Sequence, residues 1–182
     1  MNAGQGTTHA IVQDMRARRF DVRSVVLSGL VGGALFLAVD MIGRAAAPGM
    51  SAWDTPRRIA WLLIGGDIEP SASTHQPGLL VLALTLHLML ALVYAMLIVL
   101  ATRHFEPAPA ILLGALFGLG LYVLNYHVLT PLFPAFADVR GPLAIAAHVA
   151  FGSGATATHV LLHPREREVD DATPEGSASE LH

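Results

Sequence analysis

Four long apolar stretches constrain this chain more than any other feature. A hydrocarbon core of about 30 Å is crossed by about 20 mainly apolar residues in a helix. The stretches cover residues 22–43, 79–102, 109–130 and 142–163, and each is long enough to cross. Leu79–Leu100 has almost no polar residues, whereas a water-soluble helix would keep a polar face. We therefore expect an all-α integral membrane protein, a four-helix transmembrane bundle over residues 22–163.

Composition supports a membrane protein and excludes several kinds of site. Charged residues make up 14% of the chain, against about 25% in an ordinary soluble domain. The absence of cysteine excludes disulfides, thiolate zinc sites and cysteine-ligated iron–sulfur clusters. There is no basic patch of the kind that a phosphate backbone needs, so we expect no nucleic-acid partner. All eleven basic residues are arginine, which is typical of a GC-rich bacterial genome.

The arginines also predict an orientation. Seven arginines flank the spans on the side of the N-terminus and four lie on the other side, which favours N-in and C-in in the bacterial cytoplasmic (inner) membrane. Residues 1–21 form a polar cytoplasmic leader, and residues 164–182 form an acidic tail that we expect to be disordered. The first apolar run is long for a signal peptide, so we expect it to be retained as a helix.

A short helix is predicted over residues 55–65, between the first two spans. Asp54 or Thr55 is a suitable N-terminal cap. About ten helical residues cannot cross a bilayer, so this helix would lie in the interface or enter part-way. Trp53 and Trp61 fit the headgroup level, where an aromatic ring meets lipid and its N–H meets water. The helix is either an interfacial anchor or a re-entrant lid over a site.

Small residues recur at helical spacing in the spans and predict where helices touch. Glycines four residues apart, as in Gly29/Gly33 and Gly114/Gly118, allow backbones to approach closely in lipid. The second and third spans are joined by a short turn, so we expect them to be antiparallel neighbours. Polar residues share these faces, because positions i, i+4 and i+7 lie on one side of a helix. The polar candidates are Asp40, His87, Tyr122, Asn125 and His148.

Depth adds to this pattern. With the N-terminus inside, Asp40, Asn125, His148 and His87 lie about 5–13 Å below the outer surface, at about 1.5 Å rise per residue. We expect them to form an outward-facing polar pocket, with Trp53 and Arg57 at its mouth. Intramembrane ionisable residues are functional candidates by default.

Each candidate also has a structural explanation. Asp40 can pair with Arg44 four residues later and need no site at all. A histidine within a span can simply hydrogen-bond a neighbouring helix. His127 points away from Asn125 and, near the helix end, can reach headgroups.

Three functions remain open from the residues. The first is a non-enzymatic membrane protein whose polar pocket handles protons or a small ligand, alone or as an accessory subunit of a complex. The second is a redox protein that binds b-type haem or a metal ion through His87 and His148, so a cofactor is left open. The third is a structural subunit whose small-residue faces bind a membrane-protein partner or a second copy. Motifs of soluble enzymes are absent, which favours a protein that is not an enzyme.

Part of the chain resembles a known group. Three segments carry the resemblance: Leu86-His87 with Tyr94, Leu121–Pro134 (LYVLNYHVLTPLFP), and Ala147–Gly152 (AHVAFG). They resemble small bacterial four-span proteins, some labelled sodium:proline symporter-like, and more distantly the YagU inner-membrane family. The resemblance covers about residues 51–162. It implies a four-helix protein of the bacterial inner membrane and assigns no reaction.

Overall fold

The computed structural model describes residues 21–64 and 77–163, and all regular structure within them is helical. This confirms the all-α prediction. The predictions for the leader and the acidic tail lie almost entirely outside the described residues. The described elements, in chain order, are α2 (Val22–Ala46), α3 (Asp54–Ile64), α4 (Pro77–Thr102), α5 (Pro107–Val123), the π-helical segment η1 (Leu124–Val128), the 3₁₀ helix η2 (Pro134–Val139) and α6 (Pro142–Leu162).

Four helical segments are long and apolar enough to cross a membrane. They match the predicted spans to within a few residues: Val22–Ala46, Pro77–Thr102, Pro107–Val128 and Pro142–Leu162. The longest has 26 residues, or about 39 Å at 1.5 Å per residue, which crosses a core of about 30 Å even when tilted. These are the features of a multi-pass membrane protein.

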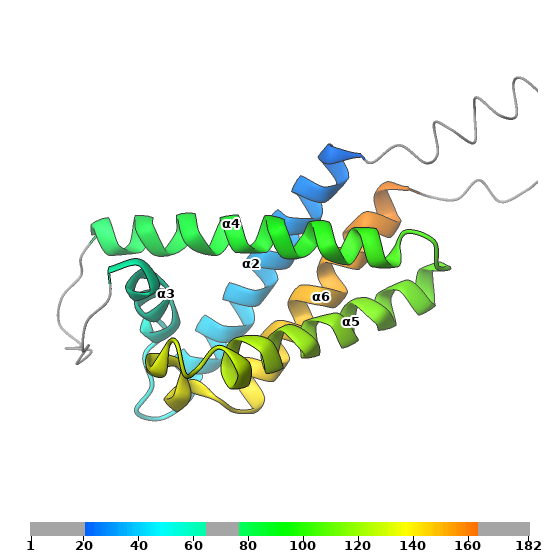
Figure 1. Ribbon diagram of the computed structural model, residues 1–182. Coiled ribbons are helices and arrows are strands. Elements are labelled where there is room, and N and C mark those ends of the chain that lie inside the picture. The colour runs from blue at the N-terminus through cyan, green and yellow to red at the C-terminus, as the bar shows by residue number, and fades with distance from the viewer. Residues whose placement is uncertain (1–20, 65–76, 164–182) are drawn as a thin grey trace, which may run out of the picture.

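Among the four long helices, α2 and α6 form the central pair. They lie side by side and run in opposite directions (Figure 1). α5 packs along α6, and α4 crosses α2 and α6 obliquely. α4 and α5 meet at the short turn between them and then diverge, so their contact is small. The expectation that these two helices are antiparallel neighbours therefore holds at the turn but not along their length. A short turn fixes where they meet, but packing on α6 and α2 decides their angle.

Glycine positions explain the closest helix contacts. A Cβ at Gly118 would overlap the backbone carbonyl of His148, and one at Gly114 would lie 2.6 Å from the carbonyl oxygen of Gly152. No larger residue fits either position unless the helices move apart. On α2, a Cβ at Gly29 or Gly33 would meet α4 at 2.9–3.3 Å. Both predicted glycine pairs therefore do mark helix–helix contacts, and both contacts lie within this chain.

The short helix α3 packs against the N-terminal half of α4. Ile59 and Ala60 are buried there with Ala83 of α4. The helix starts at Asp54, but its cap is not the predicted one. The Ser51 backbone N–H donates to Asp54 Oδ2 at 3.1 Å, and the Trp53 N–H donates to Ser51 Oγ at 3.2 Å. This reciprocal pair is close to a capping box, with serine at the cap and an acidic residue three positions later.

The end of the third span is not a regular α-helix. After Val123 the chain continues as the π segment η1, in which Leu129 N–H donates to Leu124 C=O at 2.9 Å. The wider turn leaves carbonyls without their α-helical partners. The Tyr126 carbonyl accepts from Thr130 Oγ1 and from Arg140 Nε. The sequence predicted an uninterrupted helix to residue 130, because nothing in local propensity separates a π turn from an α turn.

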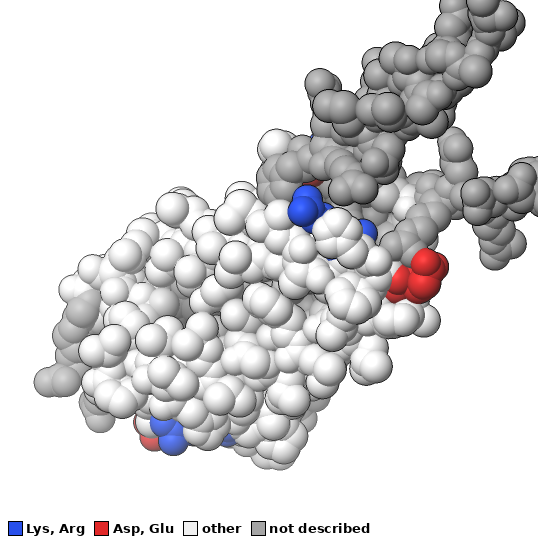
Figure 2. Space-filling view, turned by 45° about the vertical axis from the view of Figure 1, so that its right-hand side comes forward, with Lys and Arg blue, Asp and Glu red and all other residues white. Residues whose placement is uncertain are grey.

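Charged side chains lie towards two ends of the described surface (Figure 2). The broad area between them on this face is free of Lys, Arg, Asp and Glu. Large apolar side chains are exposed on the long helices, among them Val81, Met89 and Leu112. A charge-free apolar belt between charged ends is the surface that a bilayer requires.

Candidate functional site

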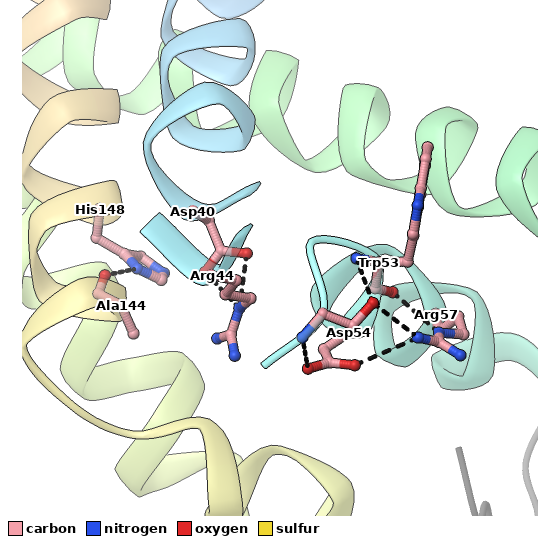
Figure 3. Close-up of polar contacts among 8 residues, drawn as sticks. Asp40, Arg44, Trp53, Asp54, Arg57, Ala144 and His148 are labelled. Atoms are coloured by element: carbon pink, nitrogen blue, oxygen red, sulfur yellow. Dashed lines mark hydrogen bonds and ion pairs between the residues drawn. The ribbon is translucent and has the colours of Figure 1, made fainter. Parts of the chain in front are cut away.

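Asp40 and Arg44 form a buried ion pair on α2, at the end of the bundle where α3 lies. Asp40 is 0% exposed and Arg44 is 4% exposed. Arg44 Nε donates to both carboxylate oxygens of Asp40, at 3.1 and 3.0 Å (Figure 3). The spacing of four residues places both side chains on one face of the helix. The local ion pair considered from the sequence is confirmed, and it lies inside the protein.

A line of hydrogen bonds joins three helical segments next to this pair. His148 Nδ1 lies 2.8 Å from the Ala144 carbonyl oxygen, which can only accept, so Nδ1 carries the hydrogen. In the neutral ring Nε2 is then an acceptor, and the Asn125 amide donates to it at 3.3 Å. The Asn125 carbonyl oxygen in turn accepts from the Tyr94 hydroxyl at 3.3 Å. Each bond along the line therefore joins one donor to one acceptor.

Three aromatic rings surround the His148 imidazole. The centroids of Phe36, Tyr126 and Tyr122 lie 4.9, 5.4 and 5.9 Å from it, each with a nearly perpendicular ring. Edge-to-face contacts of this kind are favourable because the ring edge is positive and the face is negative. Since α2, η1 and α5 each supply one ring, His148 is held from three sides.

His87 lies beside this cluster but is bonded elsewhere. Its Nε2 donates to the Gly33 carbonyl oxygen at 3.0 Å, which ties α4 to α2. Its ring contacts the same phenyl ring as His148, with centroids of His87 and Phe36 5.3 Å apart. Of the predicted polar set, Asp40, Asn125, Tyr122 and His148 thus lie together, and His87 borders them across Phe36.

Of the two residues predicted at the mouth, Arg57 lies in the first turn of α3 and Trp53 directly precedes that helix. Arg57 pairs with Asp54 at 3.3 Å and also donates to Ser51 Oγ and the Trp53 carbonyl oxygen. Trp53 is 41% exposed. Figure 3 draws this network beside the Asp40–Arg44 pair. The polar contacts of Arg57 therefore hold the start of α3 together.

Two residues near the site, Tyr126 and Arg58, were not among the predicted pocket residues. Tyr126 is 2% exposed, and it lies within electrostatic reach of Asp40, Arg44 and Arg58. Arg58 directly follows Arg57 in the sequence. Helix phase distinguishes the two residues only when the buried face of α3 is known. Tyr126 lies four residues after Tyr122, so helical spacing already places it beside Asn125 on this face. We call Asp40, Arg44, Tyr94, Asn125, Tyr126 and His148 the polar cluster.

The imidazoles do not show the arrangement that haem or a metal ion needs. Both ring nitrogens of His148 have protein partners, and His87 Nε2 is bonded to a backbone carbonyl. A bis-histidine haem needs one nitrogen of each ring directed at a shared iron, but both rings here contact Phe36. Within residues 21–64 and 77–163, no three His, Asp or Glu side chains are grouped as metal ligands.

A smaller polar contact lies at the opposite end of α2. Ser24, 0% exposed, is 2.8 Å from His159 Nδ1, a contact that joins α2 to α6. The His159 and His163 rings lie 4.7 Å apart, and His163 Nε2 is 3.5 Å from Asp21 Oδ2. This contact ties the start of α2 to the end of α6, far along the helices from the polar cluster.

Comparison with protein-family models, with curated proteins and with solved structures found no match to this chain. The family resemblance drawn from the sequence therefore stays a prediction, and function rests on the site itself.

Proposed function

We propose that this chain is a non-enzymatic, multi-pass protein of a bacterial inner membrane, folded as a four-helix transmembrane bundle with both termini inside. In this orientation the end with α3 faces outward, and α3 is the interfacial helix at the mouth of a polar pocket. Asp40, Tyr122, Asn125 and His148 line the pocket, and His87 borders it. The pocket handles protons or a small polar ligand, alone or as an accessory subunit. The inner-membrane resemblance is in line with this location.

The observation that carries the proposal is the hydrogen-bonded line from Tyr94 through Asn125 to His148. Three helical segments bring these groups to one level, beside a buried ion pair on a fourth. Packing helices together in lipid does not require buried polar groups. Such groups cost free energy unless each polar atom is hydrogen-bonded. Intramembrane polar networks of this kind mark pathways and binding sites.

We infer that the line can adopt two arrangements. With His148 neutral, the Asn125 amide nitrogen faces His148 and its oxygen faces Tyr94. A proton added to His148 Nε2 would make that atom a donor, so the amide would turn and present its oxygen instead. A bound ligand can bias the same rotation. A two-state element of this kind is what a proton or ligand response requires.

A ligand screen tests the binding role. The purified protein in mild detergent is heated with small polar compounds, and the unfolding temperature is followed. A ligand at 100 times its Kd stabilises the folded protein by about 2.7 kcal/mol. Asn125→Leu should abolish the shift, whereas Thr85→Val, on the exposed face of α4, should retain it. A shift that persists in Asn125→Leu would place the ligand elsewhere.

Orientation is tested separately. The chain has no cysteine, so a single introduced thiol is a clean reporter. Ser51→Cys, before α3, should react with a membrane-impermeant maleimide added to intact cells. Glu106→Cys, in the turn between α4 and α5, should react only after the membrane is opened. The reverse pattern would put the polar cluster on the cytoplasmic side.

A further inference from the structure

Ser28, on α2, has a buried hydroxyl without a protein partner. Its side chain is 0% exposed, and its Oγ is hydrogen-bonded by no residue of 21–64 or 77–163. The serine and threonine side chains of α4 and α6 avoid this situation, because each hydroxyl donates to the carbonyl four residues earlier on its own helix. They are Thr85, Thr102, Ser153, Thr156 and Thr158. A buried hydroxyl with no partner costs free energy, so Ser28 requires a partner of another kind.

The position of Ser28 on α2 places it between two levels at which α2 contacts α6. One turn before it, Ser24 Oγ lies 2.8 Å from His159 Nδ1. One turn after it, a Cβ at Gly32 would lie 3.0 Å from the Ala155 Cβ. The three α2 residues are buried and share one face, because they are four residues apart. Ser28 therefore faces α6 at the turn between Ala155 and His159.

The spacing of Ser24 and Ser28 suits one bridging water molecule. Cβ atoms four residues apart on a helix are about 5–6 Å apart. Two O–H···O bonds placed end to end span about 5.5 Å, so a single water reaches both hydroxyls. Buried waters in proteins bond polar groups that otherwise have no partner. Because Ser24 is already in contact with His159, a water at this place extends that contact along α2.

His159 also has neighbours that reach the protein surface. Its ring centroid lies 4.7 Å from that of His163, and His163 Nε2 lies 3.5 Å from Asp21 Oδ2. The side chains of His163 and Asp21 are 42% and 43% exposed. In the described part of the chain, these two are the titratable groups that act on His159 electrostatically, one from the end of α6 and one from the start of α2. His159 therefore lies between an exposed pair and the buried serines.

We propose that Ser24 and Ser28 bind a buried water molecule, and that this water allows His159 to accept a proton. When His159 Nδ1 carries no hydrogen, the Ser24 hydroxyl donates to it and accepts from the water. When Nδ1 takes a proton, it donates to Ser24 Oγ, and the Ser24 hydroxyl turns to donate to the water oxygen. Water fits both states because it donates and accepts. The proton comes from solvent past His163 and Asp21.

This site is separate from the polar cluster and goes beyond the proposed function. None of its residues lies in the polar cluster, and none contacts Asn125 or His148 through a described hydrogen bond. A ligand shift that depends on Asn125 therefore tests the pocket and not this water site. The water site is tested with variants of α2 instead.

The first test is the sign of a stability change in the full chain purified in mild detergent. If the Ser28 hydroxyl binds water, Ser28→Ala breaks that bond and the unfolding temperature should fall. If the hydroxyl has no partner, the same change removes an unpaired buried polar group, and the temperature should stay the same or rise. Ser153→Ala is the matched control, because its hydroxyl bonds only carbonyls of its own helix. A Ser28→Ala temperature at or above that of the wild type overturns the proposal.

The second test separates a water that serves His159 from a hydroxyl that only packs. NMR with ¹⁵N-labelled histidine follows protonation of the His159 ring across pH, and His159→Gln identifies its signal. Without the water, the Ser24 hydroxyl loses its acceptor in the protonated state. Protonation of His159 should therefore need a lower pH in Ser28→Ala than in the wild type, and the same pH in Ser153→Ala. If Ser28→Ala and the wild type protonate at the same pH, or if His159 never protonates in the folded protein, the proposal is overturned.

Discussion

The two halves of the bundle are held together by different kinds of contact. In the half away from α3, α5 and α6 pack closely because Gly114 and Gly152 have no side chains. At the α3 end, helices meet through a hydrogen-bonded line and through rings packed on His148, beside a buried ion pair within α2. Close backbone packing stabilises a membrane protein without burying polar atoms. The polar end carries a desolvation cost that packing alone does not require, and this supports the proposal that it is the functional half.

The largest expected effect comes from breaking the ion pair at the polar end. Arg44→Gln leaves Asp40 buried without its partner, which should lower the free energy of unfolding by about 3–5 kcal/mol. Denaturation of the purified protein in mixed micelles measures this. Adding Asp40→Asn should recover most of the loss. If Arg44→Gln alone were as stable as the wild type, the pair would not be desolvated as the structure has it.

The next effect breaks the close packing of the other half. Gly114→Ala forces α5 away from the Gly152 carbonyl, and such overpacking should cost about 1–3 kcal/mol. Gly120→Ala is the matched control, because nothing lies within 4 Å of a Cβ there. Thermal unfolding and the yield of monodisperse protein report the difference. Equal behaviour of the two variants would mean that α5 and α6 are not in backbone contact.

A smaller effect is expected from the hydrogen-bonded line. Interhelical hydrogen bonds in membranes contribute about 0.6 kcal/mol on average. Asn125→Leu removes two such bonds and should cost about 1.2 kcal/mol on the same scale. Tyr94→Phe removes one of the two and should cost about half as much. A larger loss in Tyr94→Phe than in Asn125→Leu would contradict the order of the line.

The smallest effect is at the opposite end of α2. Ser24→Ala removes one interhelical bond, to His159, and should cost about 0.6 kcal/mol. Ser153→Ala is a control, because the Ser153 hydroxyl bonds only to carbonyls of its own helix α6. A cost for Ser24→Ala above that of Asn125→Leu would reverse the comparison between the two ends.

Much of the fold could be predicted from the sequence, because bilayer thickness fixes helix length and small residues fix contact faces. The four spans, α3, the glycine pairs and the Asp40–Arg44 spacing all follow from local pattern. The oblique course of α4 and the π turn at the end of the third span could not be predicted. The first depends on packing between distant segments, and the second has no signal in local propensity.

The most direct test of an outward-facing polar pocket is thiol accessibility at its centre. Asn125→Cys is compared with Ala155→Cys, a fully buried position on the glycine-packed part of α6. A small, membrane-impermeant thiosulfonate is added to intact cells. Asn125→Cys should react from outside, and Ala155→Cys should not. If Asn125→Cys were unreactive, or reacted only in inverted vesicles, the polar cluster would not open to the outer side.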